Sequence, residues 1–422
     1  MKKILSVVII GILCLSMFSV LASEVNAQST VDWWSMFGHD LTHTCSSTSA
    51  GPLANTKLWS YATDNKIDYS SPAVVNGEVY VGSYDHYLYA LNAATGAFIW
   101  SYKTGGAIDS SPAVANGIVY VGSEDHSIYA LNAITGAKIW SYKTGDQVES
   151  SPAVANGVVY VGSDDNKVYA LNAQTGTKEW SFKTGDSVVS SPAVSNNVVY
   201  VGSEDDNVYA LNAQTGAEQW SYPTGDSVDS SPAVAGNLVY IGSDDYYVYG
   251  LNIANGDKVW SFSTGDQVVS CPAVANGVVY VGSLDNNLYA FNALTGSKIW
   301  SYPTGSQLES SPAVAGGVVY VGSDDNNVYA LNATTGGTVW TYGTGGLVDS
   351  SPAIANGVVY VGSNDDSLYA FGAITVPQPT PPPVPEFPSQ ALALALVAMT
   401  VCTTFAVFAA EKKRLNRKSP QS

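Results

Sequence analysis

A Ser-Ser-Pro-Ala-Val motif returns every 40 residues and constrains the fold more than any other feature of this chain. Its only departures are Cys271, which replaces one Ser, and Ile354, which replaces the last Val. The eight copies begin at Ser70, Ser110, Ser150, Ser190, Ser230, Ser270, Ser310 and Ser350. A fixed period of this size is typical of repeat proteins, in which each unit buries its apolar face only against its neighbours.

Each unit predicts four short β-strands joined by tight turns. Residues 150–189 contain four β-rich runs of about six residues, the usual strand length. Asn156-Gly157, an Asp/Asn-rich turn and a Thr-Gly pair separate these runs. Asn-Gly favours a type I′ hairpin because both residues tolerate positive φ, and the other units carry Asn-Gly, Asn-Asn, Gly-Asn or Gly-Gly there. We expect each unit to be a four-stranded antiparallel meander.

The count of strands predicts a closed ring. Trp ends the fourth strand only seven times, because the eighth unit runs into proline after Phe371. The missing strand is present before the first unit, in Lys57–Tyr61, with its own Trp59. A solenoid would need polar caps, whereas closure leaves no unpaired edge. We therefore predict an all-β, eight-bladed β-propeller closed by an N-terminal strand.

The segment between the third and fourth strands resembles the tryptophan-docking repeat of pyrroloquinoline-quinone-type (PQQ-like) propellers. Residues 170–180 match the family pattern Ala-x-Asp-x-x-Thr-Gly-x-x-x-Trp, with Asn172 in place of Asp, and five further good copies follow the same register. A weaker copy spans 250–260. Aromatic surface at one fixed place per blade can pack on the neighbouring blade. We interpret these residues as blade-to-blade staples: Trp59, Trp100, Trp140, Trp180, Trp220, Trp260, Trp300 and Trp340.

The resemblance implies two alternative functions. Some family members are quinone-dependent dehydrogenases, and others are non-catalytic, such as the lipoprotein scaffold that assists outer-membrane protein assembly. The dehydrogenases typically carry long insertions, calcium-liganding carboxylates and often an adjacent Cys pair, whereas this chain has uniform blades and no Cys-Cys. We therefore favour a binding or scaffolding module that needs no cofactor. The alternative is a PQQ-dependent dehydrogenase with a Ca²⁺-assisted cofactor site in the central channel.

Both ends of the chain predict display at the cell surface. Residues 1–27 have the basic start, apolar run and Ala-type cleavage site of a secretory signal. At the other end, a Pro-rich stalk (376–388) precedes an uncharged segment (389–410) that is long enough to span a bilayer. A basic cytoplasmic tail (411–422) follows. Pro-Glu-Phe-Pro at 385–388 resembles archaeal sorting signals, so the tail is either retained as an anchor or removed during attachment.

Residues 28–56 precede the propeller (57–375), and we interpret them as a segment that laps the ring. His39 and His43 in this segment are either metal ligands or packing residues. Cys45 could form a disulfide with Cys271, which would attach this segment to blade six. Two lone cysteines do not by themselves establish a disulfide pattern.

The acidic charge of the propeller is concentrated on one face. Residues 57–375 contain ten lysines and thirty carboxylates, which argues against a nucleic-acid partner. In a meander blade, the Asp-rich turns and the links between blades emerge on the same face. The residue before each Ser-Ser-Pro should ring the channel mouth there, and five of these positions are acidic: Asp109, Glu149, Asp229, Glu309 and Asp349.

Two interpretations of these acids stay open. Asp suits turns and aids solubility, or the ring binds a cation or a basic partner. Turn chemistry explains the turn acids better than it explains the ring. We expect a monomer whose partner is an extracellular protein or a surface glycan.

Overall fold

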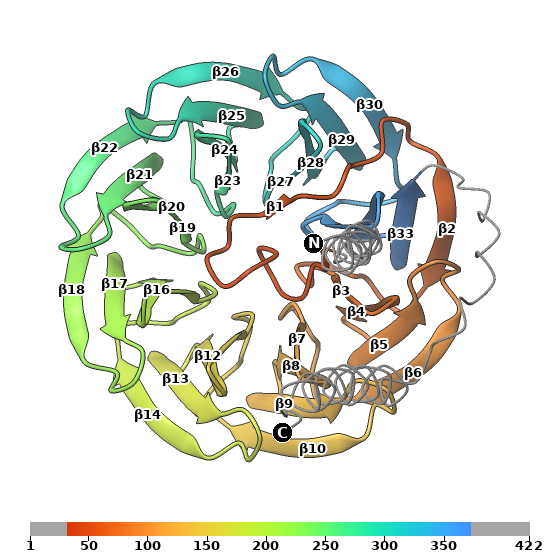
Figure 1. Ribbon diagram of the computed structural model, residues 1–422, viewed down its shortest axis with the longest axis vertical. Helices are drawn as coiled ribbons and strands as arrows, with labels where there is room; N and C mark the ends of the chain where they lie inside the picture. The colour runs from red at the N-terminus through yellow and green to blue at the C-terminus, as the bar shows by residue number, and fades with distance from the viewer. Residues whose placement is uncertain (1–31, 373–422) are drawn as a thin grey trace, which may run out of the picture. The chain divides into compact units, whose positions relative to one another are not determined.

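The computed structural model describes residues 32–372, which form eight β-sheets arranged as the blades of a ring (Figure 1). Seven sheets have four strands, and one has a fifth short strand, Ser46–Ser47. Antiparallel pairing joins consecutive strands within each blade, as in the hairpin between Ala153–Ala155 and Val158–Ser163. The shortest strand of each blade faces the central channel and the last one forms the outer wall (Figure 1). The prediction of an eight-bladed propeller is confirmed.

The first four blades use consecutive strands of the chain. Blade 1 contains β3 (Ala73–Val75), β4 (Glu78–Gly82), β5 (Tyr87–Asn92) and β6 (Phe98–Lys103). Blade 2 contains β7 (Ala113–Ala115), β8 (Ile118–Ser123), β9 (Ser127–Asn132) and β10 (Lys138–Lys143). Blade 3 contains β11 (Ala153–Ala155), β12 (Val158–Ser163), β13 (Lys167–Asn172) and β14 (Lys178–Lys183). Blade 4 contains β15 (Ala193–Ser195), β16 (Val198–Ser203), β17 (Asn207–Asn212) and β18 (Glu218–Pro223).

The remaining blades follow the same order until the last one. Blade 5 contains β19 (Ala233–Ala235), β20 (Leu238–Gly242), β21 (Tyr247–Asn252) and β22 (Lys258–Ser263). Blade 6 contains β23 (Ala273–Ala275), β24 (Val278–Gly282), β25 (Asn287–Asn292) and β26 (Lys298–Pro303). Blade 7 contains β27 (Ala313–Ala315), β28 (Val318–Ser323), β29 (Asn327–Asn332) and β30 (Thr338–Gly343). Blade 8 contains β31 (Ala353–Ala355), β32 (Val358–Ser363), β33 (Ser367–Gly372) and β2 (Lys57–Ala62).

The N-terminal strand β2 closes the ring, as the sequence predicts. It pairs antiparallel with β33, and Trp59 stands opposite Ala370. The same pairing places Trp180 opposite Ala170 in blade 3. Blade 8 therefore receives its outer strand from the opposite end of the chain and has four strands like the other blades.

The first hairpin turn of each blade has the predicted turn chemistry. Both residues have positive φ at seven of the eight turns, as at Asn156 (52°) and Gly157 (81°). The exception is Gly236-Asn237, where only Gly236 has positive φ. Type I′ turns match the twist of the strands they join, so this two-residue signal marks the first hairpin in these seven blades.

The first Ser of each motif forms a continuous circle of hydrogen bonds around the inner wall. Each Oγ donates to the main-chain oxygen of the first Ser in the next blade over 2.9–3.2 Å, and Ser350 returns to Ser70. The same Oγ accepts the N–H of the strand glycine in its own blade, as Ser190 does from Gly202 at 3.0 Å. All eight hydroxyls are fully buried. This circle explains why Ser recurs at this position.

The second Ser adds a parallel series of bonds between blades. Its main-chain N–H donates to the second-Ser Oγ of the next blade at 2.9–3.0 Å. The series skips Ser231, whose neighbour at the equivalent position is Cys271.

The Trp residues that end the outer strands lie against the next blade. Trp180 is 8% exposed, and its Nε1–H donates to Ala213 O at 2.9 Å. Its indole packs on Gly216, where a Cβ atom would come within 2.7 Å of the ring. Trp340 differs, because its Nε1–H donates to Pro52 O of the N-terminal segment at 2.9 Å. Pro52 therefore takes the place that a turn of blade 8 would have filled.

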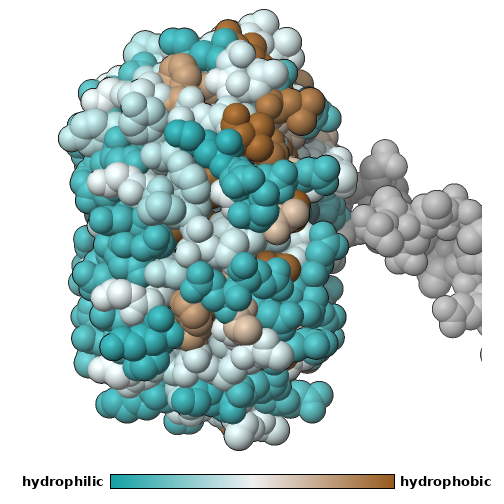
Figure 2. All heavy atoms as spheres, turned by 90° about the vertical axis from the view of Figure 1, so that its left-hand side faces the viewer, coloured by the Kyte–Doolittle hydropathy of each residue, from teal (hydrophilic) through white to brown (hydrophobic). Residues whose placement is uncertain are grey.

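The outer wall shows no broad apolar surface on the side that Figure 2 presents. This side includes β18 and β22, and hydrophilic residues cover most of it, with hydrophobic residues scattered between them (Figure 2). The alternation within each outer strand explains this, since the Trp points inward while its neighbours face solvent.

The N-terminal segment crosses the centre of the ring (Figure 1). We call residues 34–45 the plug. Their main-chain oxygens accept hydrogen bonds from the fifth residue of the motif in six blades at 2.6–2.8 Å, namely Val74, Val114, Val194, Val234, Val274 and Val314. The plug continues into β1 (Ser46–Ser47), which pairs parallel with β27. Main-chain hydrogen bonds like those between β-strands therefore hold this segment against the channel wall.

Several predicted segments lie outside the described residues. They are the signal (1–27), the first four residues of the segment before the propeller (28–31), the last three propeller residues (373–375), the stalk (376–388), the apolar segment (389–410) and the basic tail (411–422). Within residues 32–372, no helix has the length and apolar character needed to cross a membrane.

Candidate functional site

The channel forms an acidic cavity that is closed at one end. The plug meets the wall beside the first hairpin turns, and its Phe37 lines the cavity together with residues at the opposite mouth. The cavity has a volume of about 420 Å³. We call it the cup. Hydroxyl groups of the second Ser line its wall in six blades: Ser111, Ser151, Ser191, Ser231, Ser311 and Ser351.

All five acidic residues predicted to ring the channel mouth line the cup: Asp109, Glu149, Asp229, Glu309 and Asp349. Tyr69, Val189 and Val269 occupy the equivalent positions in the other blades that contribute to the lining. Asp109 and Asp349 are each only 6% exposed. The repeat explains this arrangement, because the residue before Ser-Ser-Pro enters the innermost strand of every blade at the same height.

A second tier of acids surrounds this ring. These residues occupy the first position of the turn between the second and third strands, and Glu204 and Asp244 of this tier also line the cup. A carboxylate oxygen of Glu124 lies within 4.8 Å of ligand atoms of Asp109 and Glu149. The sequence placed these acids in the Asp-rich turns, but it did not distinguish them from the acids at the other positions of the same turns.

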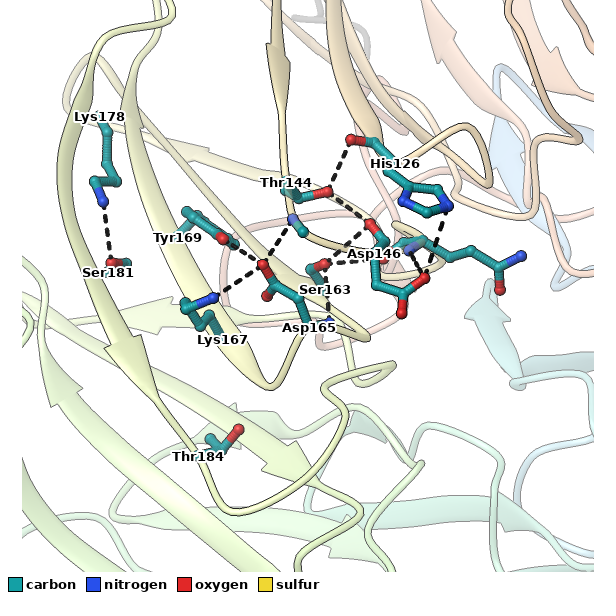
Figure 3. A network of polar contacts seen from close by, with 12 residues as sticks. His126, Thr144, Asp146, Ser163, Asp165, Lys167, Tyr169, Lys178, Ser181 and Thr184 are labelled. Atoms are coloured by element: carbon teal, nitrogen blue, oxygen red, sulfur yellow. Dashed lines mark hydrogen bonds and ion pairs between the residues drawn. The ribbon is translucent and has the colours of Figure 1, made fainter.

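The Asp at the second position of the same turn has a structural role in every blade. In blade 3, Asp165 Oδ2 accepts hydrogen bonds from Tyr169 Oη at 2.5 Å, Gly145 N at 2.8 Å and Lys167 Nζ at 3.1 Å (Figure 3). Gly145 belongs to the link that leaves blade 2, so the bond joins two blades. Turn chemistry explains this set of acids: Asp85, Asp125, Asp165, Asp205, Asp245, Asp285, Asp325 and Asp365.

Burial makes ionisation of the cup carboxylates costly. Burial, together with neighbouring carboxylates, raises the pKa of Asp109 to about 8 and that of Asp229 to about 7, although the hydrogen bond from Tyr84 lowers the pKa of Asp109. Burial together with Asp324 and Asp68 raises the pKa of Asp349 to about 9. Like charges held in a poorly solvated site disfavour the ionised form. The cup therefore favours a ligand that brings positive charge into it, because such a ligand offsets the repulsion between the carboxylates.

Several cup oxygens have no hydrogen-bond partner. Asp109 accepts a bond from Tyr84 Oη at 2.9 Å and Asp349 accepts one from Asn364 Nδ2 at 2.8 Å, each through Oδ2. In both residues Oδ1 is buried and unpaired, as is Oδ1 of Asp229. Within residues 32–372, no Lys or Arg lines the cup. Buried acceptors without donors are costly in a folded protein, so these oxygens are available to a ligand that donates.

Neither His39 nor His43 lies in a cluster with metal-ligand spacing among residues 32–372. His39 Nε2 lies 3.0 Å from Asp32 Oδ1, and His43 Nδ1 contacts Pro232 O at 3.2 Å. Both therefore pack the plug against its surroundings. Among the described residues, the one cluster with metal-ligand spacing is Asp109, Glu124 and Glu149.

The structure brings together the two cysteines that the sequence suggested as a pair. Cys45 of the plug is 3% exposed and Cys271 of the inner wall is 1% exposed. Both are thiols in the structure and their side chains belong to one buried cluster, where the Sγ–H of Cys271 donates to Pro272 O at 3.7 Å.

Eight uniform four-stranded blades around a plugged channel define a closed eight-bladed β-propeller. A scan of protein families matches the model described as "Outer membrane protein assembly factor BamB" to residues 50–150, 127–261, 223–312 and 303–375. These matches cover most of the chain, so it belongs to this family of PQQ-like repeat propellers. No curated protein matches the chain.

Solved structures share the fold at low sequence identity. BamB from Moraxella catarrhalis is 20% identical with a TM-score of 0.66, over 75% of this chain and 99% of that chain. A europium-containing methanol dehydrogenase is 16% identical with a TM-score of 0.70, over 81% and 98%. The quinohemoprotein alcohol dehydrogenase from Comamonas testosteroni is 17% identical with a TM-score of 0.71, over 84% and 82%. At these identities the comparison establishes the propeller fold alone.

Proposed function

We propose that this protein is a non-catalytic binding module, anchored at the outer face of the cell membrane, which captures a partner protein through the acidic cup. The single observation that carries the proposal is the set of buried, unpaired carboxylate oxygens in a cavity whose described lining contains no Lys or Arg. The proposed location rests on the apolar segments at the two ends of the sequence.

A basic side chain of a protein fits the chemistry of the cup. An arginine guanidinium has five N–H donors and remains charged, so it can satisfy several carboxylates and the Ser hydroxyls at once. The apolar stem of Lys or Arg needs an apolar contact, and Val189, Val269 and Phe37 supply one. A neutral glycan can form hydrogen bonds in the cup but brings no positive charge into it. These features favour a protein partner over a surface glycan.

Binding of a short fluorescent arginine-rich peptide to the purified full chain tests this proposal. We expect saturable binding that weakens with salt, because paired charges are screened. Neutralising Asp109, Glu149 and Asp229 as Asn or Gln should weaken the affinity at least about tenfold, since a desolvated charge pair contributes a few kcal/mol. The matched control neutralises three exposed carboxylates, Glu179 and Glu218 on the outer strands and Asp257 beside one of them, and should bind almost as wild type does.

Other outcomes of the same assay contradict the proposal. Equal loss of binding in the cup and control variants would assign the effect to overall charge. Binding of neutral surface oligosaccharides that survives neutralisation of the cup would assign the function to a glycan. If Ca²⁺ alone binds and the peptide does not compete with it, the cup is a metal site and not a docking site.

The quinone-dependent dehydrogenase is less well supported. Pyrroloquinoline quinone carries three carboxylates, and the described lining of the cup offers carboxylates and hydroxyls without a basic side chain to pair with them. The residues present therefore do not fit this cofactor by charge. Incubating the purified protein with pyrroloquinoline quinone and Ca²⁺ discriminates the two functions, because retention of one cofactor per chain would favour the dehydrogenase.

A further inference from the structure

We propose that Cys45 and Cys271 form a disulfide bond that locks the plug into the channel and keeps the cup closed at its floor. This inference concerns how the cup is built and does not depend on which ligand the cup accepts. The two residues are the only cysteines among residues 32–372. They come from segments that are far apart in the sequence, and the ring brings them together.

The main chain of the plug places Cys45 beside blade 6. The N–H of Val274 in blade 6 donates to Thr44 O at 2.8 Å, and the N–H of Val314 in blade 7 donates to Cys45 O at 2.8 Å. Cys271 leads into strand β23 of the same blade, three residues before Val274. Main-chain bonds on both sides of Cys45 therefore fix its position relative to the inner wall. Both side chains belong to one buried cluster.

Cys271 is a departure from the repeat that weakens the inner wall unless it forms a new contact. The second Ser of the motif accepts an N–H from the preceding blade in seven of the eight positions. Cys271 occupies the eighth position, and Ser231 has no equivalent bond to it. A thiol accepts hydrogen bonds poorly. The one position that gives up this bond is the one that faces the cysteine of the plug.

The step that joins them is a two-electron oxidation. Each thiol loses its proton, one S–S bond forms, and the two electrons and two protons reduce the disulfide of a thiol–disulfide oxidoreductase to its dithiol. The attacking species is a thiolate. The neighbouring Cys271 side chain and burial raise the pKa of the Cys45 thiol well above its usual range. We therefore infer that the bond forms while the plug docks, when both thiols still reach solvent, and not in the finished ring.

The bond would give the plug a covalent attachment that its main-chain contacts lack. Six hydrogen bonds from Val residues hold residues 34–45 against the wall, and such contacts can open locally without unfolding of the whole domain. A disulfide removes this opening at the position of Cys45. Phe37, which belongs to the same plug and lines the cup, is then kept at the floor.

Peptide mapping of the full chain, purified without reductant from an oxidising compartment, tests the bond directly. Free thiols are alkylated under denaturing conditions before digestion. We expect a linked peptide pair that contains Cys45 and Cys271 and disappears after reduction. Alkylation of both residues without reductant would overturn the proposal.

Hydrogen exchange of residues 32–45 tests the consequence for the plug. Cys45→Ser removes the bond, whereas Cys271→Ser removes it and restores the Ser of the repeat, so the inner wall of this second variant is complete. We expect both variants to exchange the plug amides at least about tenfold faster than wild type while the blade amides stay protected. Plug exchange in Cys271→Ser that equals wild type would show that the bond does not hold the plug.

Discussion

Replacing a first-position Ser of the motif by Ala should cost about twice as much stability as replacing the Ser that follows it. Ser190 Oγ donates to Ser230 O at 2.9 Å and accepts from Gly202 N at 3.0 Å. Ser191 Oγ accepts one bond, from Ser151 N at 3.0 Å. A buried polar group that loses its partner costs about 1–3 kcal/mol. We therefore expect Ser190→Ala to lose about 2–6 kcal/mol and Ser191→Ala to lose about 1–3 kcal/mol.

Equilibrium unfolding in urea, followed by Trp fluorescence, measures both differences in the free energy of unfolding. The two positions are adjacent and buried, and both substitutions remove one oxygen atom, so Ser191→Ala is the matched control for side-chain volume. Equal losses in the two variants would refute the idea that the first Ser has a double role. A loss below about 0.5 kcal/mol for Ser190→Ala, which is the range of neutral surface substitutions, would refute the hydrogen-bonded circle altogether.

Two further predictions concern pH and the packing between blades. Asp349, Asp109 and Asp229 have raised pKa values of about 9, 8 and 7 in the folded chain. The folded state therefore binds more protons than the unfolded state above pH about 4, and the melting temperature should rise as the pH falls from about 9 to 5. A melting temperature that rises with pH over this range would contradict the assignment. Gly162→Ala should destabilise the ring by about 1–3 kcal/mol, because its Cβ would lie 2.2 Å from Val188 O. Gly337→Ala, whose Cβ would meet only the Thr335 hydroxyl at 3.3 Å, is the control, and equal melting temperatures would argue against tight blade contact.

Much of the fold could be predicted because the repeat places the same local signals in every blade. The hairpin turns depend on two adjacent residues such as Asn156-Gly157. The closure of the ring could be predicted because eight copies of the motif are followed by only seven Trp residues, and the eighth Trp precedes the first copy. The inner ring of acids could be predicted for the same reason, since Asp109 and its equivalents keep one position in the repeat.

The rest of the site could not be predicted because it depends on contacts between distant segments. Glu204 and Asp205 are adjacent acids in one turn, yet Glu204 lines the cup and Asp205 binds Tyr209 and the link from the previous blade. Only the direction of each side chain in the folded blade separates them. The role of Pro52 as acceptor for Trp340 was equally hidden, because this segment has no repeat pattern.

The number of blades, the strands within each blade and the closure by Trp59 follow from the sequence alone, because periodic local signals specify periodic structure. That the channel is a cup follows only from the folded molecule. The plug carries no repeat, and its place depends on main-chain bonds to six separate blades. The same docking brings Cys45 to Cys271 and Phe37 to the acids. These contacts exist only after the ring has closed, because closure sets the distance across the channel that the plug must fill.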